Sequence, residues 1–490
     1  MEQYTVCQQK TLYFLDKQLE NAELLGGIHY CKIIGSAGTG KTFICAKWIE
    51  KLNFNIYKVA CVAPTRKALS ILKQKISYKR NLRFLTLHSL LNFKCDYDIN
   101  GKMKFISSSD KINLDFNIIF IDESSMISIE IYKYLTEKIV LEKNKKHCLI
   151  IFMGDICQLP PVNENVSRSL LENYEMINLK EIIRSKNELI SQMYKIWRKN
   201  VIHDINKKYK LSIKNNNNVL YFRKNEDFKI ILCKNITNFI NKNQNSIVLS
   251  YSNKSVSVYN NLIRNYLFGK DAKNPFCPGE KLIVNNGLIY GFKNEFPIFD
   301  KKNNRYVTND FININLVTIV EMDMPELEYN NIKYNFPKMK TWMLTNDKSD
   351  NFFIIHKDSK HDWNLLKKKW RDIINCLKDQ YHSLKKDSDN LKKIGKSVEE
   401  QRKEIKKECK ILKLEIKDWW KLFIYMQNSY NAPLIYAYSL TVHKSQGSTF
   451  QNVFVDAKNI KICTKKNISL QRRCLYTAVS RASDSMVMLI

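Results

Sequence analysis

The sequence predicts an α/β protein whose parallel strands carry functional groups at their carboxyl ends. Apolar strand-like runs at 31–34, 59–63, 117–121 and 149–153 alternate with helical patterns, and polar residues follow each run directly. The first run leads into the glycine-rich stretch GSAGTGKT at 35–42, which opens an apolar-periodic segment. Strands that alternate with helices favour a parallel sheet, in which the loops at the carboxyl ends meet at one edge.

Composition allows several domains and suggests a polyanionic partner. The chain has 490 residues, 44% of them hydrophobic, enough for about three domains with filled cores. Its 80 Lys and Arg against 48 Asp and Glu give a net charge of +32. Such a surface attracts nucleic acid, although a coding bias toward Lys and Asn would raise the charge as well.

Cysteine usage and hydropathy bear on the compartment. The 13 cysteines are scattered without a C-x-x-C pair, which argues for a reducing compartment and against a disulfide framework or a zinc site. The first ten residues lack an apolar signal-peptide core, and no apolar run is long enough to span a bilayer. We therefore expect a soluble, intracellular protein.

Residues 35–42 fit the phosphate-binding loop G-x-x-x-x-G-K-[ST]. Gly35, Gly38 and Gly40 would let backbone N–H groups approach phosphates at the start of a helix. Lys41 would reach the β- and γ-phosphates, and Thr42 would hold Mg²⁺. An ordinary glycine turn is the alternative, and the context of strand, loop and helix disfavours it.

A helix is expected over residues 8–25, because leucines repeat there at helical spacing before a Gly-Gly stop. Gln8 at its start could cap the edge of an adenine, since an amide both donates and accepts hydrogen bonds. A solvent-facing glutamine is the alternative, and Gln9 is the spare candidate.

Two strand ends and a hairpin follow. The run at 59–63 ends in Pro64 and Thr65, and a similar strand–helix junction lies at 86–89; such edges present hydroxyls and amides to ligands. Residues 92–107 predict a β-hairpin, since Asn-Gly at 100–101 is a two-residue turn signal between alternating segments. Tyr97 beside its tip could stack on a base, or it could be an ordinary packed tyrosine.

Paired carboxylates and an amide follow the later strands. The run at 117–121 delivers Asp122, which can hold Mg²⁺, and Glu123, which can orient or deprotonate an attacking water. A helix-capping aspartate is the alternative for Asp122. The run at 149–153 ends in a Pro-ended loop from which Gln158 could reach the γ-phosphate.

In this order and at these distances, the motifs resemble those of superfamily 1 helicases: GSAGTGKT, VAPTRKAL, TLHSLL, IIFIDESSM and IFMGDICQLPPV. The C-terminal half agrees through LKEIIRS, SLTVHKSQGSTFQNVFVD and LYTAVSRA. They look most like the RecD-like branch (superfamily 1B), which includes the phage helicase Dda. The resemblance covers residues 1–270 and 430–490 approximately.

The resemblance implies residue roles. Guanidinium groups that arrive from a separate domain stabilise charge on a transferring phosphoryl group and couple hydrolysis to domain closure. Catalysis would fall to Lys41, Glu123, Gln158, Arg184 and Arg481. ATP would be bound by Gly35, Gly38, Thr39, Gly40, Lys41, Thr42 and Gly447, with Gln8 added from the first helix, and Mg²⁺ by Thr42 and Asp122.

A second set would face DNA. Single-stranded DNA would contact Pro64, Thr65, Thr86, His88, Thr441, His443, Lys444 and Gln446, with Tyr97 added from the hairpin. Hydroxyls, amides and a cation suit contacts to phosphates that do not depend on sequence. Without the flanking motifs, Arg184 and Arg481 would be read as surface arginines. His88 and His443 remain open to the alternative of structural histidines.

The resemblance also implies a layout: two RecA-like parallel-sheet P-loop domains in tandem, with a small SH3-like β-barrel and a helical arm inserted in the second. The first would span 1–178 with a hairpin wedge at 90–113, and the second 179–275 with 428–490. A strand at 245–253 followed by a helix through 267 fits the second domain. The barrel would span 276–356, with strands at 281–284, 312–321, 341–344 and 352–356.

Residues 357–427 depart most from the family. Apolar residues repeat there at helical spacing, and a second helical run at 398–420 follows a break at 387–390. Two antiparallel helices with Lys-rich outer faces would form an arm, with a core of Trp363, Leu366, Trp370, Ile374 and Leu377. A base-stacking role is the alternative for the tryptophans. The arm could brace the hairpin, contact DNA phosphates or bind a replication partner, and the sequence does not choose among these.

These features predict an ATP- and Mg²⁺-dependent DNA helicase that translocates on single-stranded DNA and unwinds duplexes in replication, recombination or repair. A 5′ to 3′ polarity is implied by the resemblance alone. The expected partners are single-stranded and forked duplex DNA and replication proteins such as a single-strand-binding protein, with no membrane. We expect a monomer in the cytoplasm or at a site of DNA replication, with a nuclear location as the alternative.

Three alternatives remain at this stage. A translocase that displaces proteins or RNA would share the ATP site but would not need a wedge. A nucleic-acid-binding scaffold with a degenerate ATPase would be expected to have lost some of the catalytic set, which is intact. A small-molecule kinase would not need the motifs at 439–456 and 475–482.

Overall fold

The computed structural model describes residues 4–77, 79–107, 115–141, 147–185, 187–202, 219–241, 245–285, 311–394 and 398–490. The chain divides into two compact units. Unit 1 comprises Met1–Asn92, Ser108–Ala272 and Ala437–Ile490, and unit 2 comprises Phe93–Ser107 and Lys273–Tyr436. Within the described ranges, no helix is long and apolar enough to cross a membrane.

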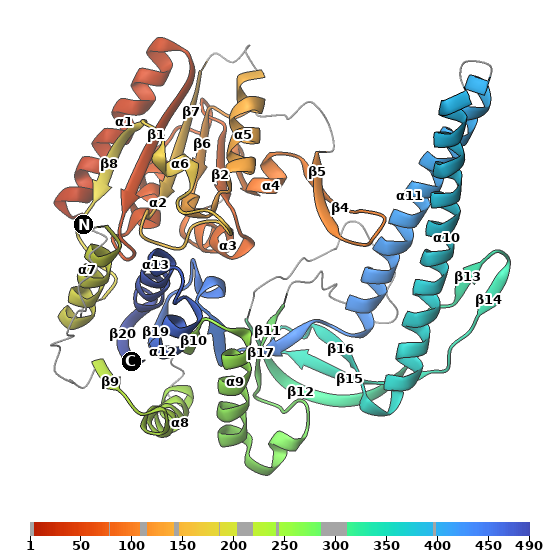
Figure 1. Ribbon diagram of the computed structural model, residues 1–490. Helices are drawn as coiled ribbons and strands as arrows, with labels where there is room; N and C mark the ends of the chain where they lie inside the picture. Colours follow the sequence, from red (N-terminus) through yellow and green to blue (C-terminus); the bar gives the residue numbers. More distant parts are fainter. Residues whose placement is uncertain are drawn as a thin grey trace. The chain divides into compact units, whose positions relative to one another are not determined.

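Unit 1 contains the predicted parallel sheet (Figure 1). Its six strands lie in the order β3-β2-β6-β7-β1-β8, and every pair is parallel. Parallel strands covered on both faces read as continuous apolar runs, which is why β2 and β6 were visible in the sequence. The strands are β1 (Gly27–Gly35), β2 (Val59–Ala63), β3 (Leu82–Thr86), β6 (Ile118–Ile121), β7 (His147–Gly154) and β8 (Glu175–Leu179).

Helices connect these strands, and we call this sheet with its helices the first lobe. The predicted first helix is confirmed as α1, which starts with a Thr5–Gln8 capping box and ends at Gly26. The other helices are short turns or crossovers between parallel strands. The set is α1 (Val6–Leu25), α2 (Lys41–Lys51), α3 (Arg66–Lys75), α4 (Leu87–Leu90), α5 (Ile129–Leu141) and α6 (Arg168–Leu171).

A second parallel sheet completes unit 1, in the order β18-β10-β19-β20-β9. We call it, with its helices, the second lobe; α7 belongs to it because it packs on α13 and β20. Two parallel sheets in tandem are the predicted RecA-like architecture. The strands are β9 (Val219–Phe222), β10 (Ser246–Ser250), β18 (Ser439–Thr441), β19 (Phe450–Asp456) and β20 (Ala482–Leu489). The helices are α7 (Glu188–Ile202), α8 (Asn225–Asn241), α9 (Asn253–Phe268), α12 (Ala457–Cys463) and α13 (Ile468–Val479).

Unit 2 contains a five-stranded antiparallel sheet in the order β16-β15-β12-β11-β17. The four predicted strands are confirmed as β11 (Lys281–Val284), β12 (Phe311–Met322), β15 (Met339–Asn346) and β16 (Asn351–Ile355). The sequence did not predict β17 (Leu434–Tyr436) or the hairpin of β13 (Leu327–Tyr329) and β14 (Ile332–Tyr334). An SH3-like closure stays a prediction, and residues 286–310 of the proposed barrel lie outside the described ranges.

The arm consists of two long helices that pack side by side, α10 (Lys360–Ile394) and α11 (Glu399–Tyr430) (Figure 1). The predicted core is confirmed, because all five of its members are buried: Trp363, Leu366, Trp370, Ile374 and Leu377. The predicted break at 387–390 is wrong, since α10 runs through it. Packing against α11 outweighs the weak helix propensity of this polar stretch, and Ser388 within it is buried.

The predicted hairpin is confirmed as β4 (Phe93–Tyr97) and β5 (Met103–Ser107), but its turn is longer than predicted. Five residues, 98–102, connect the strands in place of a two-residue turn. The Asp98 carboxylate causes this, because its Oδ1 accepts from the backbone N–H groups of Asn100 and Lys102, each at 2.9 Å.

Candidate nucleotide and nucleic-acid site

The phosphate-binding loop joins β1 to α2 in the first lobe. Gly40 forms the N-cap of α2 with φ 78°, and Gly38 has φ 83°. At Gly38 a Cβ would lie 2.6 Å from the Cβ of Arg184, so glycine is required both for the turn and for the approach of that arginine. Lys41 Nζ donates to the carbonyl oxygens of Gly35 (2.9 Å) and Ser36 (3.0 Å). Burial lowers the pKa of Lys41, against the opposing effect of nearby carboxylates.

Oxygen ligands for a divalent cation meet beside this loop. Thr42 Oγ1 donates to Asp122 Oδ2 at 3.1 Å, although 80 residues separate them in the chain. Burial and the neighbouring Glu123 raise the pKa of Asp122 to about 7. A divalent cation favours the ionised carboxylate, and Mg²⁺ prefers hydroxyl and carboxylate oxygens, so this pair fits it. Glu123 adopts φ 50°, a conformation that is rare outside glycine and is typical of functional sites.

Gln158 and two arginines reach the same cavity from other elements. Gln158 is buried, and its Oε1 has no hydrogen-bond partner. Arg184 follows β8 and donates through Nη1 to the Ser480 carbonyl oxygen at 2.7 Å, which attaches it to the second lobe. Arg481 is 1% exposed and directly precedes β20. The cavity of about 380 Å³ is lined by Ala37, Gly38, Gly40, Lys41, Thr42, Phe43, Lys75, Asp122, Glu123, Gln158, Ile183, Arg184, Thr449 and Arg481.

All five residues predicted to be catalytic therefore line one cavity. Sequence reasoning assigned no role to Phe43, Lys75, Ile183 and Thr449 in its lining, although Ile183 and Thr449 lie within the quoted motifs. Of the predicted ATP-binding residues, Gly447 lies on the second lobe opposite Glu123, where a Cβ would be 3.9 Å from Glu123 Oε1. Thr39 is buried and donates to the Ser36 carbonyl oxygen at 3.0 Å, within the loop.

Gln8 is buried at 2% exposure, so the solvent-facing alternative is wrong. Its Oε1 accepts from Thr5 N at 3.1 Å, while its Nε2 has no hydrogen-bond partner. The same Nε2 would lie 2.8 Å from a Cβ at Gly40, which puts a free amide donor against the phosphate-binding loop. Contact with adenine stays a prediction.

The DNA-facing candidates of the first lobe lie at the carboxyl ends of β2 and β3, which are neighbours in the sheet. The hydroxyls of Thr65 and Thr86 cap α3 and α4, accepting from the N–H groups of Ala68 and Ser89. Pro64, His88 and both threonines are half-buried. Their contact with DNA remains a prediction.

The second-lobe candidates follow β18. Thr441 is buried, Lys444 is half-buried, and His443 is exposed with its ring edge-on to Tyr251 at 5.5 Å. Gln446 does not point freely outward, because its Nε2 donates to the Leu159 carbonyl oxygen of the first lobe at 3.0 Å.

Tyr97 lies in unit 2 and is buried at 7% exposure. It is therefore not available to stack on a base in this structure, which agrees with the packed alternative. The exposed apolar side chains of the hairpin are Met103, Phe105 and Ile106 on β5.

The structure reveals a contact between the hairpin and the arm that the sequence left open. Asp96 Oδ2 accepts from Lys417 Nζ at 2.6 Å, and Lys421 Nζ lies 3.3 Å from Oδ1. Trp420 Nε1 donates to the Ile99 carbonyl oxygen at 3.1 Å. At Gly101, with φ 74°, a Cβ would lie 2.7 Å from the Trp420 indole, so the turn rests against this ring. Partners 321 residues apart leave no local sequence signal.

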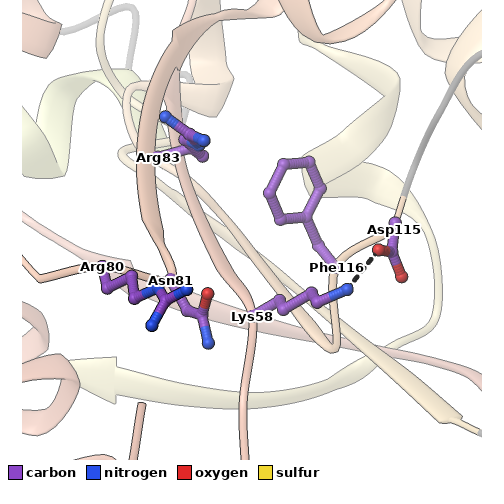
Figure 2. A pocket seen from close by; sticks show the side chains of 6 residues that line it. All are labelled: Lys58, Arg80, Asn81, Arg83, Asp115 and Phe116. Atoms are coloured by element: carbon purple, nitrogen blue, oxygen red, sulfur yellow. Dashed lines mark hydrogen bonds and ion pairs between the residues drawn. The ribbon is translucent and has the colours of Figure 1, made fainter. Parts of the chain in front are cut away.

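A second cavity of about 260 Å³ lies at the opposite, amino edge of the first sheet (Figure 2). Its lining residues lie in β3 or directly precede β2, β3 and β6: Lys58, Arg80, Asn81, Arg83, Asp115 and Phe116. Lys58 and Asp115 form an ion pair across it, and both are exposed, so this pair contributes little stability. The lining has no hydroxyl–carboxylate pair, and all the predicted ATP-binding groups lie elsewhere.

Comparisons with known proteins match segments in both lobes. The family model described as AAA domain matches residues 24–164, and the model described as UvrD-like helicase C-terminal domain matches residues 436–489. The uncharacterised protein R530 of Acanthamoeba polyphaga mimivirus is 29% identical over 490 residues, covering 94% of both chains. The RecBCD enzyme subunit RecD of Buchnera aphidicola is 28% identical over 313 residues, which cover 59% of this chain and 46% of RecD.

Among solved structures, one of Pif1 helicases at forked double-stranded DNA is 14% identical, with a TM-score of 0.48, and covers 99% of this chain and 92% of that one. The ordered motifs, the two family models and the RecD relative point to the same family. Together these similarities support a superfamily 1 helicase of the RecD-like branch, superfamily 1B.

Proposed function

We propose that this protein is an ATP-dependent DNA helicase that translocates on single-stranded DNA and unwinds duplexes. The observation that carries the proposal is the shared cavity, in which Arg184 and Arg481, both attached to the second lobe, meet the phosphate-binding loop of the first. Such a cavity is complete only when the two lobes are together. Binding and hydrolysis of a nucleotide in it would therefore be coupled to closure and opening of the lobes.

The residues of the cavity have complementary tasks. A water molecule attacks the γ-phosphorus, its proton passes to the Glu123 carboxylate, and the bond to the β-phosphate oxygen breaks to give ADP and phosphate. Lys41, Arg184 and Arg481 stabilise the charge on the transferring group, and Gln158 orients it. Mg²⁺, held by Thr42 and Asp122, would supply additional positive charge to the phosphate oxygens.

Cycles of closure and opening would then move the chain along one strand. The carboxyl-edge residues of both lobes are the proposed DNA contacts, and the 5′ to 3′ direction follows the family resemblance. The hairpin is the proposed wedge. Its turn is supported by Trp420. Because Tyr97 is buried, the side chains proposed to contact bases are Met103 and Phe105, which are exposed on β5. Replication proteins such as a single-strand-binding protein are proposed partners of the monomer.

Forked duplexes test this function. The full chain is incubated with duplexes that carry only a 5′ or only a 3′ single-stranded tail, with and without ATP and Mg²⁺, beside a Lys41→Ala control. We expect ATP-dependent strand separation of the 5′-tailed substrate and none with Lys41→Ala, because the lysine stabilises the γ-phosphate. Unwinding that survives Lys41→Ala, or ATP turnover that ignores added single-stranded DNA, would refute the proposal.

A further inference from the structure

The loop after β7, residues 155–159, carries Gln158 into the cavity, yet side chains of the second lobe hold it. Arg473 of α13 donates through Nη1 to the carbonyl oxygens of Ile156 and, at 3.1 Å, Gln158. Gln446 donates to the carbonyl oxygen of Leu159. We call residues 155–159 the sensor loop. Its backbone is therefore held by the lobe that does not contain it.

Asp155 is the centre of these contacts and is fully buried. Its Oδ2 accepts from the hydroxyl of Tyr476 at 2.6 Å, and its Oδ1 accepts from Arg198 Nη1 at 2.5 Å and from Cys157 N at 3.1 Å. Burial alone would raise the pKa of Asp155, but Arg198, Lys41 and Tyr476 hold it below its ordinary value. The carboxylate is therefore ionised and hydrogen-bonded from both lobes.

Tyr476 also touches the phosphate-binding loop. Its hydroxyl oxygen accepts from the backbone N–H of Ala37 at 3.1 Å while it donates to Asp155. Tyr476 is fully buried in α13, five residues before Arg481 in the chain. One hydroxyl thus joins the phosphate-binding loop, the sensor loop and the helix that precedes Arg481.

These contacts have an energetic consequence. A buried carboxylate without partners is strongly unfavourable, and two of the three donors to Asp155 come from the second lobe. Separation of the lobes would leave Asp155 with only the Cys157 N–H as a donor, or expose it to water, while docking satisfies it and fixes the sensor loop. The position of Gln158 is thereby tied to the closed arrangement.

We propose that Tyr476 and Asp155 form a positioning pair that places Gln158 and Arg481 on the γ-phosphate only when the lobes are closed. The inference rests on the proposed ATP hydrolysis in this cavity. Tyr476 does not touch the reacting atoms. Its loss should therefore lower the rate of the chemical step and leave ATP binding, which uses the phosphate-binding loop itself, largely intact.

Tyr476→Phe in the full chain tests the pair, because it removes one hydroxyl and keeps the ring. The matched control is Tyr259→Phe, another buried tyrosine whose hydroxyl donates to a carboxylate, Asp456 Oδ2 at 2.8 Å, within the second lobe. We expect Tyr476→Phe to lower kcat for ATP about tenfold or more, with KM for ATP within about twofold, since a hydrogen bond to a charged group is lost. The control should keep its kcat.

Two further measurements separate positioning from damage. Asp155→Asn should lower kcat as well, and the double variant should be no slower than the slower single variant, because both changes remove the same contact. Equal losses of kcat in Tyr476→Phe and Tyr259→Phe, or additive losses in the double variant, would overturn the inference.

A thermal-shift experiment distinguishes failure of the pair from failure of the proposed function. ADP with aluminium fluoride and Mg²⁺ imitates the transferring phosphoryl group, so wild-type protein should be stabilised beyond the effect of ADP alone. Tyr476→Phe should keep the shift from ADP and lose the additional shift. If wild-type protein turned over ATP without regard to DNA, the helicase proposal would fail, while retention of the additional shift by Tyr476→Phe would refute the pair.

Discussion

The guanidinium of Arg481 illustrates how a single residue is prepared for its proposed task. Three acceptors hold it: the carbonyl oxygens of Thr477 at 3.1 Å and Ser448 at 3.2 Å, and Ser480 Oγ at 2.9 Å. Burial, followed by the nearby Arg184, lowers its pKa to about 10. Because this pKa is lower than in the unfolded chain, the charged guanidinium lowers the free energy of unfolding, and this loss is fully present at every pH below about 10. Buried charges that persist at such a cost are typical of functional sites.

Arg481→Lys should show whether the fork geometry of this cation is used. Lysine keeps the charge but cannot fill three fixed acceptors and reach a phosphate with a planar fork. We expect kcat for ATP to fall by at least about 100-fold in steady-state turnover, with a small change in KM, as for other cations that act on a transferring phosphoryl group. If kcat stayed within about threefold of wild type, a single positive charge would be sufficient, and the proposed role of the planar guanidinium would be contradicted.

The site residues that the sequence predicted share one property. Lys41, Thr42, Asp122 and Gln158 each lie in the segment that follows the carboxyl end of a strand, so their position follows from motif and topology together. Tyr476, Asp155 and Arg198 meet only through tertiary packing. Sequence reasoning included the motifs around Tyr476 and Asp155 but assigned these two residues no role, because a spacing of 321 residues carries no geometric information before the fold is known.

The hairpin and α11 form the clearest pairing between elements in unit 2. An isolated two-stranded hairpin is only marginally stable, and here Lys417 and Trp420 hold one strand and the turn. Burial would raise the pKa of Asp96, but hydrogen bonds from Lys417, the Tyr97 backbone and Lys421 lower it. The stabilisation by this carboxylate is therefore fully present above pH 4 approximately, and is lost only as the pH falls through the lowered folded value.

Trp420→Ala should impair duplex unwinding while leaving ATP turnover nearly unchanged. The change leaves the Ile99 carbonyl oxygen without its donor and removes the ring beneath Gly101, so the turn loses its support. We expect unwinding of forked DNA to fall about tenfold or more, since losing a half-buried hydrogen bond and the packing of the ring costs about 1–3 kcal/mol. ATP turnover stimulated by single-stranded DNA should stay within about twofold, because the cavity lies in unit 1.

A substitution on the arm's core provides the control. Leu377→Ala destabilises the packing of α10 against α11 without touching the turn. Should it impair unwinding as much as Trp420→Ala, general loosening of the arm would explain both, and the wedge role of the supported turn would be contradicted.

The sequence predicted most helices and strands, but it did not predict all of their ends or the elements on which they pack. Continuous apolar runs identified β2, β6 and β7, because parallel strands buried on both faces need no alternation. The Asn-Gly signal found the hairpin but not its five-residue turn, which depends on the Asp98 side chain. The polar stretch at 387–390 was read as a break, because local propensity cannot register the packing of α11.

The net charge of +32 concerns the whole molecule, and it does not by itself locate the DNA. Among the first-lobe candidates at the carboxyl edge, Pro64, Thr65, Thr86 and His88 carry no permanent charge, whereas the second lobe adds Lys444. Lysines are plentiful elsewhere, for example Lys385 and Lys386 on α10, which are exposed. Total charge and DNA contact must therefore be distinguished by the release of counterions at individual sites.

Salt dependence makes that distinction. Each phosphate neutralised on single-stranded DNA contributes about −0.7 to the slope of log K against log salt concentration. If Lys444 pairs with a phosphate, Lys444→Ala should reduce the slope of single-stranded DNA binding by about 0.7, whereas Lys385→Ala should leave it unchanged unless the arm also follows the strand. Fluorescence anisotropy with a labelled oligonucleotide at several salt concentrations measures both slopes. An equal reduction in the two variants would assign the DNA path to the diffuse charge of the surface and contradict a track along the carboxyl edges of the two sheets.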